Sequence, residues 1–297
     1  MSFTTSQPQR LFWYDGQLVE SNSLTLPIDH PALLYGASVF TTIRVYANDL
    51  HHPKTFWQAH IQRLKFSLDR FNWDFSHWQR LELGAAALLP FFPVLRLTIF
   101  PDGSELIQGS NLPADLSHSQ QSGVVAQVMP PPPDTSGGTL TEKLTEISTE
   151  IFYDRSLANH KTGNYLAPWL ALQFARRHGA KEAILTDPAG NWLETATGNL
   201  WGYDGHTWFT PSLSSPNGNL ILPGITRAYL LAGLQRDGYS VQEAVWNLDL
   251  VKQLTMIAYS NSVVGIIPFR QIYLDKSQLT FAVTDADLSQ LRSYFNE

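Results

Sequence analysis

Residues 183–210 read "AILTDPAGNWLETATGNLWGYDGHTWFT", and this stretch decides the class of fold. Runs of β-branched, aliphatic and aromatic residues alternate in it with short segments rich in Gly, Pro, Asn and Asp. Such spacing is typical of strands separated by turns. The stretch therefore predicts a β-meander, in which one carboxylate, Glu194, lies inside an apolar strand.

Helical patterns flank the predicted meander. Residues 164–178 carry apolar residues at helical spacing and stop at Gly179, with basic residues in the last turn, as helix C-termini prefer. Residues 222–227, "LPGITR", open a second helix that runs to about Gly238, and further strand-like runs follow it. Interleaved helices and strands predict a mixed α/β or α+β fold.

The N-terminal part shows the same mixture. An Asp-Gly turn divides residues 11–20 into two short strands, and residues 38–46, 94–100 and 123–129 have the composition of buried strands. Residues 56–71 space their apolar side chains as a helix does. Each half of the chain is therefore expected to contain its own sheet.

A proline-rich segment separates the two halves. Residues 130–138, "PPPPDTSGG", can continue neither a helix nor a sheet and predict a semi-stiff linker. We place a smaller N-terminal α/β domain at residues 1–129, the linker at 130–140 and a larger C-terminal domain, which begins with a β-rich run at 145–152, at 141–297. The alternative is a surface loop within a single domain.

The composition narrows the possible partners. The chain is 43% hydrophobic and only 15% charged, against about 25% charged in an average globular protein, and it contains nine Trp. This composition gives the chain more apolar surface than a single subunit needs to bury, which predicts a permanent subunit interface. A net charge of −6 disfavours a nucleic-acid partner, because phosphate binding needs clustered Lys and Arg.

The numbers of Cys and His and the lengths of the apolar stretches predict the cellular location and the metal content. The sequence has no Cys, which excludes disulfides and thiolate metal sites and fits a reducing compartment. Its nine His lack zinc-like spacing, so no metal site is expected. No stretch reaches the ~20 apolar residues of a membrane span, and residues 1–10 lack the apolar core of a signal peptide. We expect a soluble, cytoplasmic protein.

Lys161 stands in residues 160–166, "HKTGNYL", just before the first helix of the C-terminal half. The ordinary interpretation is a solvated lysine beside a helix start, since lysine is mostly exposed. A helix N-terminus carries a positive partial charge, however, and would depress the pKa of a lysine beside it. An amine with a depressed pKa suits a nucleophile or a base.

Two further features complement this amine. Glu194 lies among apolar residues, where a carboxylate needs a cation or a proton donor, although it could also point outward from its strand. The "LPGITR" segment offers backbone N–H groups and a hydroxyl at a helix start, which can bind phosphate, although it could also be an ordinary helix start. A lysine, a carboxylate and a phosphate cradle are the set that a pyridoxal-phosphate enzyme needs.

Several motifs in order along nearly the whole chain resemble those of class IV (fold type IV) pyridoxal-phosphate enzymes. They are "HPALLYGASVFTTIRVY", "AHIQRL", "HKTGNYL", "WLETATGN", "GNLILPGITR" and "YSNSVVGIIPFR". This family contains branched-chain and D-amino-acid aminotransferases and aminodeoxychorismate lyases. The resemblance implies two domains with the cofactor, pyridoxal 5′-phosphate, between them, and a homodimer whose subunits both contribute to each site.

The resemblance also implies roles for individual residues. Lys161 would hold the cofactor as an imine, Glu194 would pair with its pyridine nitrogen, and Tyr165 would lie near its ring hydroxyl. The phosphate would be bound by Arg63, Ile225, Thr226 and Ser262.

The prediction of the substrate rests on other residues than the prediction of the cofactor. "FTTIRVY" carries Thr41 and Thr42 where branched-chain enzymes usually have Glu-Gly, and this resembles the lyases, whereas "KTGNYLAPW" and "LPGITR" resemble the aminotransferases. The segment after residues 94–100 lacks the arginines that lyases and D-amino-acid aminotransferases carry there for the substrate carboxylate. The substrate-binding candidates are Tyr35, Thr41, Thr42, Arg44 and Arg96.

We therefore expect a lyase that converts 4-amino-4-deoxychorismate to 4-aminobenzoate and pyruvate for folate biosynthesis. The alternative within the family is an aminotransferase that passes an amino group from a branched-chain or D-amino acid to a 2-oxo acid. The alternative from another class is a non-catalytic protein that binds a small ligand through its many aromatic side chains.

Overall fold

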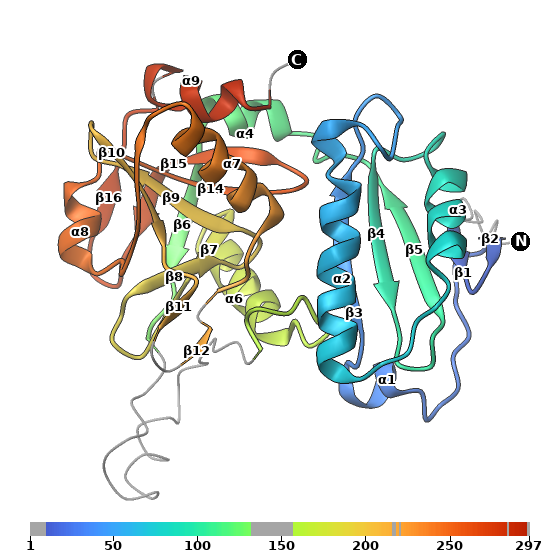
Figure 1. The fold of residues 1–297 in the computed structure, drawn as a ribbon. Coiled ribbons are helices and arrows are strands. Elements are labelled where there is room, and N and C mark those ends of the chain that lie inside the picture. Colours follow the sequence, from blue (N-terminus) through green and yellow to red (C-terminus); the bar gives the residue numbers. More distant parts are fainter. Residues whose placement is uncertain (1–9, 132–156, 216–217, 220, 284, 296–297) are drawn as a thin grey trace, which may run out of the picture. The chain divides into compact units, whose positions relative to one another are not determined.

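The structure is a computed structural model that describes residues 10–131, 157–215, 218–219, 221–283 and 285–295. The chain divides into two compact units (Figure 1). Unit 1 contains the chain up to Pro113 together with Lys161–Asn164, and unit 2 contains the rest. The linker predicted at 130–140 and the β-rich run at 145–152 fall almost entirely outside the described residues, so both stay predictions.

Unit 1 is built on an antiparallel sheet with the strand order β2-β1-β5-β4-β3. Helices α2 and α3 cover one face of this sheet (Figure 1). The strands are β1 Leu11–Tyr14, β2 Gln17–Glu20, β3 Val39–Arg44, β4 Val94–Ile99 and β5 Glu105–Ser110. The helices are α1 Pro31–Tyr35, the short 3-10 helix η1 Pro53–Thr55, α2 Trp57–Phe71 and α3 Trp78–Leu88.

Alternation along β3 sets which side chains face these helices. Val39, Thr41 and Ile43 are buried on the helix side, because successive side chains in a strand point to opposite faces. Helix α2 buries one stripe at helical spacing, which includes Ile61 and Leu64, against them. The residues left on the other face of β3 are Phe40, Thr42 and Arg44.

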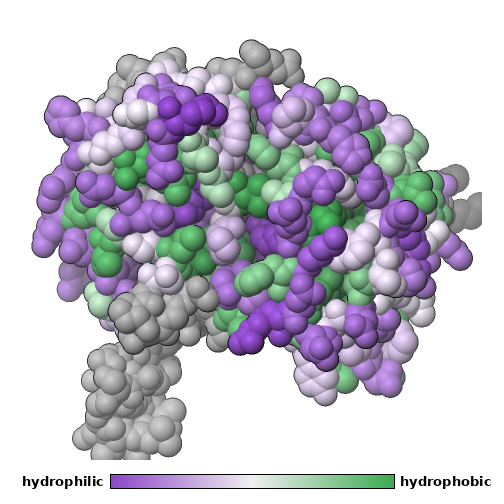
Figure 2. Space-filling view, viewed as in Figure 1, coloured by the Kyte–Doolittle hydropathy of each residue, from purple (hydrophilic) through white to green (hydrophobic). Residues whose placement is uncertain are grey.

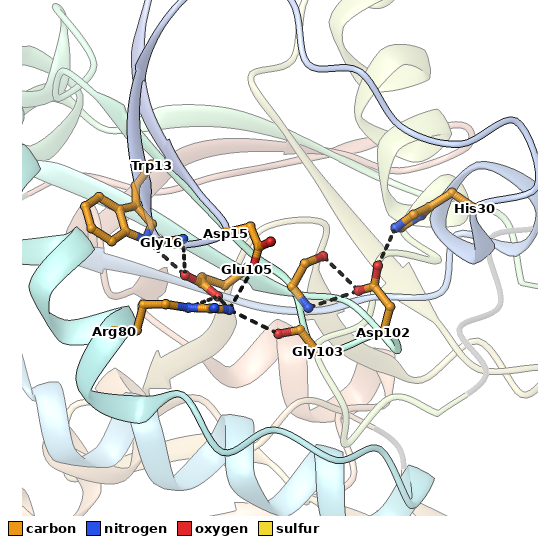
Figure 3. Close-up of polar contacts among 9 residues, drawn as sticks. Trp13, Asp15, Gly16, His30, Arg80, Asp102, Gly103 and Glu105 are labelled. Atoms are coloured by element: carbon orange, nitrogen blue, oxygen red, sulfur yellow. Dashed lines mark hydrogen bonds and ion pairs between the residues drawn. The ribbon is translucent and has the colours of Figure 1, made fainter.

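A buried ion pair fixes the edge of unit 1 far from β3 (Figure 3). Arg80 of α3 pairs with the fully buried carboxylate of Glu105 and, at 2.9 Å, with Asp15 in the β1–β2 turn. The other Glu105 oxygen accepts hydrogen bonds from Trp13 Nε1 at 3.0 Å and from the Gly16 amide at 3.1 Å. Helix α3, strand β5 and the predicted Asp-Gly turn are thereby joined.

Unit 2 contains a mixed sheet with the order β13-β10-β9-β14-β15-β6-β7-β8, and β16 pairs with β15. The pairs β10–β13, β6–β15 and β6–β7 are parallel. The strands are β6 Val124–Val128, β7 Glu182–Thr186, β8 Trp192–Thr195, β9 Asn199–Tyr203, β10 Thr207–Pro211, β13 Ser240–Ala244, β14 Met256–Asn261, β15 Gly265–Tyr273 and β16 Gln278–Thr280, with a separate pair of β11 Ser214–Ser215 and β12 Gly218–Asn219.

Helices of unit 2 bury two separate apolar clusters. Helix α6 packs small side chains, Ala171 and Ala175, against β6 and β7. Leu230 and Leu234 of α7 pack with Leu291 of α9 against β9, β10 and β14. The helices are α4 Leu116–Ser122, α6 Leu166–Arg177, α7 Ile225–Arg236, α8 Leu248–Gln253 and α9 Asp285–Ser293. Within the described part of the chain, no helix is long and apolar enough to cross a membrane.

The predicted β-meander is right in its strands but wrong in one pairing. Strand β8 pairs with β7, yet β9 pairs with β10 and with the distant β14. The change occurs at Gly198, where a Cβ atom would lie 2.3 Å from the carbonyl oxygen of Ser260. Glycine allows the chain to leave β8 here and to start β9 directly against β14.

The surface is mixed in character. Figure 2 shows hydrophobic residues lying among hydrophilic ones on the face in view. The exposed large hydrophobic side chains of unit 1 include four close together in sequence, Ile28, Leu33, Leu34 and Tyr35. The last three belong to α1, a helix with no buried residue.

Candidate active site

Lys161 lies on a short segment that extends the sheet of unit 1. The amide of Phe40 donates to the Lys161 carbonyl at 2.8 Å, and the amide of Gly163 donates to the Ser38 carbonyl at 2.7 Å. A bridge between Val39 and Thr162 lies between these two bonds. Lys161–Asn164 is thus held along the free edge of β3.

Gly163 makes this approach possible. A Cβ atom at this position would lie 2.3 Å from Ser38 Oγ and 2.5 Å from the Gly36 carbonyl oxygen. A larger residue would push the segment away from β3, and Lys161 with it.

The surroundings of Lys161 include the ring of Phe40. Lys161 Nζ lies 5.0 Å from the centroid of that ring. Helix α6 begins at Leu166, five residues beyond Lys161, and the expected effect of this helix on the pKa of Lys161 stays a prediction.

Phe40 connects Lys161 with the substrate-binding candidates on the same face of β3. The guanidinium carbon of Arg96 lies 3.5 Å from the Phe40 ring centroid. Arg96 of β4 is the cross-strand partner of Thr42, so their side chains share one face of the sheet. Arg44 lies farther along β3, with its guanidinium carbon 4.7 Å from the ring centroid of Tyr46.

The opposite face of β3 holds Arg63 through Thr41. Arg63 Nη2 donates to Thr41 Oγ1 at 2.7 Å, and Thr41 Oγ1 lies 2.5 Å from Nδ1 of His60. Thr41 and His60 are fully buried. Because a guanidinium can only donate, the Thr41 hydroxyl accepts from Arg63 and can give its own hydrogen to His60.

His60 is suited to accept that hydrogen. Burial lowers the pKa of its imidazole well below the ordinary value, and the positive charges of Arg63 and Lys161 lower it further. The imidazole is therefore neutral at physiological pH. His60 and Phe40 were missed at the level of sequence, although both stand inside the motifs "AHIQRL" and "FTTIRVY".

Unit 2 supplies the carboxylate. The side chain of Glu194, on β8, is only 4% exposed, which excludes the outward-pointing alternative. Its Oε2 accepts a hydrogen bond from the amide of Leu222 at 3.1 Å. Asn199 Nδ2 donates to the Leu222 carbonyl at 2.9 Å. Leu222, the first residue of "LPGITR", is thus hydrogen-bonded to side chains of both β8 and β9.

The start of α7 gathers donors suited to a phosphate. Gly224 is the N-cap and makes no side-chain cap hydrogen bond, so Ile225 and Thr226 begin a helix whose first amides face the helix end. The hydroxyls of Thr226 and Ser262 lie 3.3 Å apart. Amides at a helix N-terminus together with two hydroxyls fit the phosphate group of a cofactor.

The remaining candidates occupy different places. Tyr165 precedes α6 and donates its hydroxyl to the carbonyl of Ala196 at 3.1 Å, in the loop after Glu194. Tyr35 ends α1 and is 75% exposed.

The candidates thus form two groups, and the roles assigned to them stay predictions. In unit 1 the structure brings Thr41 and Arg63 together on one face of β3. The other face carries Phe40 and Thr42, with Arg96 beside them on β4. Lys161 approaches Phe40 from the strand edge. In unit 2 it brings Thr226 and Ser262 together, and it ties Glu194 and Tyr165 to the segments around them.

Comparisons with known proteins identify the family of this chain. The family model for amino-transferase class IV matches residues 38–272. An aminodeoxychorismate lyase from Vibrio harveyi is 24% identical over 288 residues, covering 92% of this chain and 95% of that protein. The branched-chain-amino-acid aminotransferase of Escherichia coli K12 is 26% identical over 288 residues, covering 90% of this chain and 86% of that protein.

Solved structures share the fold. The crystal structure of the Escherichia coli branched-chain aminotransferase gives a TM-score of 0.73 at 23% identity, over 97% of this chain and 94% of that one. A hypothetical aminotransferase from Mycobacterium tuberculosis in its PLP-bound form gives 0.73 at 19% identity, over 96% and 98%. The predicted mixed α/β class is confirmed. With most of its length matched by the family model, the chain belongs to the class IV aminotransferases, which are enzymes that use pyridoxal 5′-phosphate.

Proposed function

We propose that this enzyme is an aminodeoxychorismate lyase, which releases 4-aminobenzoate and pyruvate from 4-amino-4-deoxychorismate. The observation that carries the proposal is Thr42. It lies on the face of β3 that carries Phe40, the residue whose ring Lys161 approaches. Thr41 lies on the opposite face, with its hydroxyl bound between His60 and Arg63.

In this proposal the two threonines have different roles. Elimination of the enolpyruvyl group needs a proton donor near the leaving oxygen. The Thr42 hydroxyl is available on the Lys161 side, whereas the Thr41 hydroxyl holds Arg63. The aminotransferase of Escherichia coli K12, at 26% identity, and the lyase of Vibrio harveyi, at 24%, are about equally similar to this chain. Sequence similarity therefore does not separate the two activities, and the proposal rests on Thr42 and its surroundings.

The donor sets fit the cofactor. When bound, pyridoxal 5′-phosphate supplies a ring that withdraws electrons from the substrate carbon beside the amine. Lys161 would attach the cofactor and then take the proton from that carbon. Glu194 would keep a proton on the pyridine nitrogen, and Tyr165 would orient the ring hydroxyl.

Cationic and polar groups would anchor the two ends of the bound molecules. Arg63, the first amides of α7, Thr226 and Ser262 would bind the cofactor phosphate. Arg96 would bind a substrate carboxylate, because a guanidinium matches a carboxylate in two parallel hydrogen bonds, and its position above Phe40 places it on the Thr42 side.

The test supplies 4-amino-4-deoxychorismate to the pure protein and measures 4-aminobenzoate and pyruvate. A parallel assay supplies branched-chain or D-amino acids with 2-oxoglutarate. Release of 4-aminobenzoate supports the lyase. Transamination without 4-aminobenzoate would instead assign an aminotransferase, the alternative that "KTGNYLAPW" and the similarity to the Escherichia coli enzyme favour.

The cofactor is tested separately by its visible absorption band. Incubation with pyridoxal 5′-phosphate should produce a band that borohydride removes, and Lys161→Ala should abolish it. A wild-type protein that stays colourless would contradict the enzyme assignment and favour a non-catalytic ligand-binding protein.

We also propose that the enzyme is a homodimer in the cytoplasm. The exposed apolar side chains of α1 support an interface, and the resemblance to the family gives Tyr35 a place in a site shared by two subunits. The cysteine-free sequence supports the reducing compartment.

A further inference from the structure

Glu182 is a buried carboxylate to which the proposed reaction gives no role. It begins β7 and is 2% exposed. The amide of Ala183 donates to its Oε1 at 2.9 Å, and the hydroxyl of Thr197 donates to its Oε2 in a short hydrogen bond. A buried carboxylate is costly, so its presence points to the partner that it holds, Thr197.

Thr197 lies in the loop 196–198 between β8 and β9, and Thr195, the last residue of β8, fixes this loop. The hydroxyl of Thr195 accepts from the amides of Thr197 at 3.3 Å and Gly198 at 2.9 Å. Glu194 stands directly before Thr195. A displacement of Thr197 therefore moves the loop as one piece.

The same residue connects to the phosphate-binding candidates. Asn261 Nδ2 donates to the Thr197 carbonyl at 3.2 Å. Asn261 Oδ1 accepts from the amides of Val263 at 2.9 Å and Val264 at 3.0 Å. This side chain closes the turn that carries Ser262, whose hydroxyl meets that of Thr226. A continuous series of hydrogen bonds runs from Glu182 to the start of α7.

The electrostatic surroundings show how strongly Glu182 is enclosed. Burial raises the pKa of its carboxyl to about 7, although the hydrogen bonds from Thr197 and Ala183 and the charge of Arg176 on α6 lower it. Tyr259 of β14 also faces it, and the pKa of that phenol is raised by burial and by Glu182. Both forms of Glu182 can keep a hydrogen bond with Thr197, since a hydroxyl can donate or accept.

We propose that Glu182 is a positioning residue that, through Thr197 and Asn261, holds the Ser262 turn in place to bind the phosphate group of the cofactor. The inference rests on the proposed function, which assigns Ser262 and Thr226 to that phosphate. It goes beyond that function because Glu182 touches neither cofactor nor substrate in the assigned roles.

The experiment compares Glu182→Ala, Glu182→Gln and Thr197→Val. Alanine removes the bond to Thr197. Glutamine keeps its carbonyl oxygen for the Ala183 amide and can donate its NH₂ to Thr197 Oγ1, so it should rescue the function. Valine removes the Thr197 hydroxyl at nearly constant volume and serves as a second variant if Glu182→Ala folds poorly.

The first readout is the ratio of the affinities for pyridoxal 5′-phosphate and for pyridoxal, which lacks the phosphate. Glu182→Ala and Thr197→Val should lower this ratio about tenfold, the effect of losing one buried hydrogen bond. Glu182→Gln should keep it close to the wild-type value. An unchanged ratio in Glu182→Ala, or a Glu182→Gln variant as impaired as Glu182→Ala, would overturn the proposal.

The second readout needs no cofactor. Hydrogen exchange of the Val263 and Val264 amides, which donate to Asn261, should accelerate in Glu182→Ala without acceleration of the α7 interior. Glu105→Gln is the matched control, because it changes a buried carboxylate of unit 1 bonded by Arg80 and Trp13. That control should lose stability while keeping the affinity ratio and the two exchange rates.

The two readouts separate this inference from the proposed function. A wild-type protein without the cofactor band contradicts the function, and the exchange rates then still decide whether Glu182 holds the turn. A wild-type protein that binds the cofactor, with Glu182→Ala exchange equal to wild type, contradicts the inference alone.

Discussion

Thr41 and Thr42 are neighbours in sequence with opposite surroundings. Their side chains point to different faces of β3, so one hydroxyl is fully committed to His60 and Arg63 while the other is half-buried opposite Arg96. The proposed function gives these two identical residues different roles, and each role can be removed alone.

Replacing Thr42 by Val should lower kcat for 4-aminobenzoate release by about a hundredfold, a typical effect of losing a general acid. Affinity for pyridoxal 5′-phosphate should stay unchanged, because Arg63 keeps its partner. Thr41→Val is the matched comparison and should show the reverse: weaker cofactor binding, since Arg63 loses the oxygen that orients it. A Thr42→Val enzyme with full kcat would refute the assignment of the proton donor.

At the level of elements, the segment Lys161–Asn164 depends on one close approach. Gly163→Ala places a methyl group against Ser38 Oγ and the Gly36 carbonyl, and the backbone oxygen cannot move without disturbing the neighbouring chain. The segment should separate from β3, and the yield of covalently attached cofactor after borohydride reduction should fall at least about tenfold if one or two edge hydrogen bonds are lost.

The control for this variant is Gly190→Ala in the turn between β7 and β8. No heavy atom lies within 4 Å of a Cβ there, but the φ angle is +79°. The variant should therefore lose about 1 kcal/mol of folding stability through backbone strain and retain cofactor attachment. Normal attachment in Gly163→Ala would show that the lysine does not need the β3 edge.

Elements with strong local patterns could be read from the sequence, and the others could not. Helix α2 follows from the spacing of Ile61, Leu64 and Leu68, and the first hairpin follows from its Asp-Gly turn. The β9–β14 pairing joins residues about sixty positions apart, as in Leu200 with Tyr259, and no local pattern encodes it. Helices α1, α3, α4, α8 and α9 and strands β5, β11, β12 and β16 were not predicted. α4 and α8 span only seven and six residues, too short for a helical stripe to stand out.

The site shows the same division. The sequence left two orientations open for Glu194, enclosed with a partner or pointing outward from its strand, and the side chain is buried. His60 was overlooked because an isolated histidine in a helix gives no sign of the Thr41 hydroxyl across the sheet face. Phe40 was overlooked because an aromatic residue in a strand is ordinary core material. Its role depends on Lys161, which arrives from a segment over one hundred residues later.

For the whole molecule, two buried groups give opposite contributions to stability. The pKa of His60 lies below the unfolded value of 6.5, so the stability present above pH 6.5 is lost as the pH falls below it. The pKa of Glu182 rises from 4.5 to about 7, so its contribution is full below pH 4.5 and is lost as the pH rises toward 7. Below pH 6.5 the two contributions to stability therefore change with pH in opposite directions.

Variants that remove one of the two groups should reveal how the other makes the free energy of unfolding depend on pH. In Glu182→Gln only the contribution of His60 remains. Relative to wild type, the free energy of unfolding should therefore fall as the pH drops below 6.5, by about 1.4 kcal/mol per pH unit, the value for one proton. His60→Gln should make it fall by a similar slope as the pH rises from 4.5 toward 7. Urea unfolding at a series of pH values measures both. Equal pH profiles for the two single variants would contradict the opposite signs.

The oligomeric state is tested on α1. The wild-type enzyme should have about twice the 33.4 kDa mass of one chain by light scattering. Leu33→Lys with Leu34→Lys should shift it toward the single-chain mass, because charges at an apolar interface are strongly unfavourable. Phe66→Lys, on another exposed apolar residue of unit 1, should leave the mass unchanged. A wild-type mass of one chain would contradict the dimer.

The segment Lys161–Asn164, which returns to unit 1, also affects how the chain folds during its synthesis. A nascent chain that ends at Pro113 contains every regular strand of the unit 1 sheet but leaves the edge of β3 uncovered. Uncovered strand edges invite pairing with other chains. Synthesis must continue to residue 164 before that edge is closed, and the segment that closes it delivers Lys161. The chain therefore places Lys161, the lysine proposed to attach the cofactor, in the same step that covers the exposed edge of its first-made half.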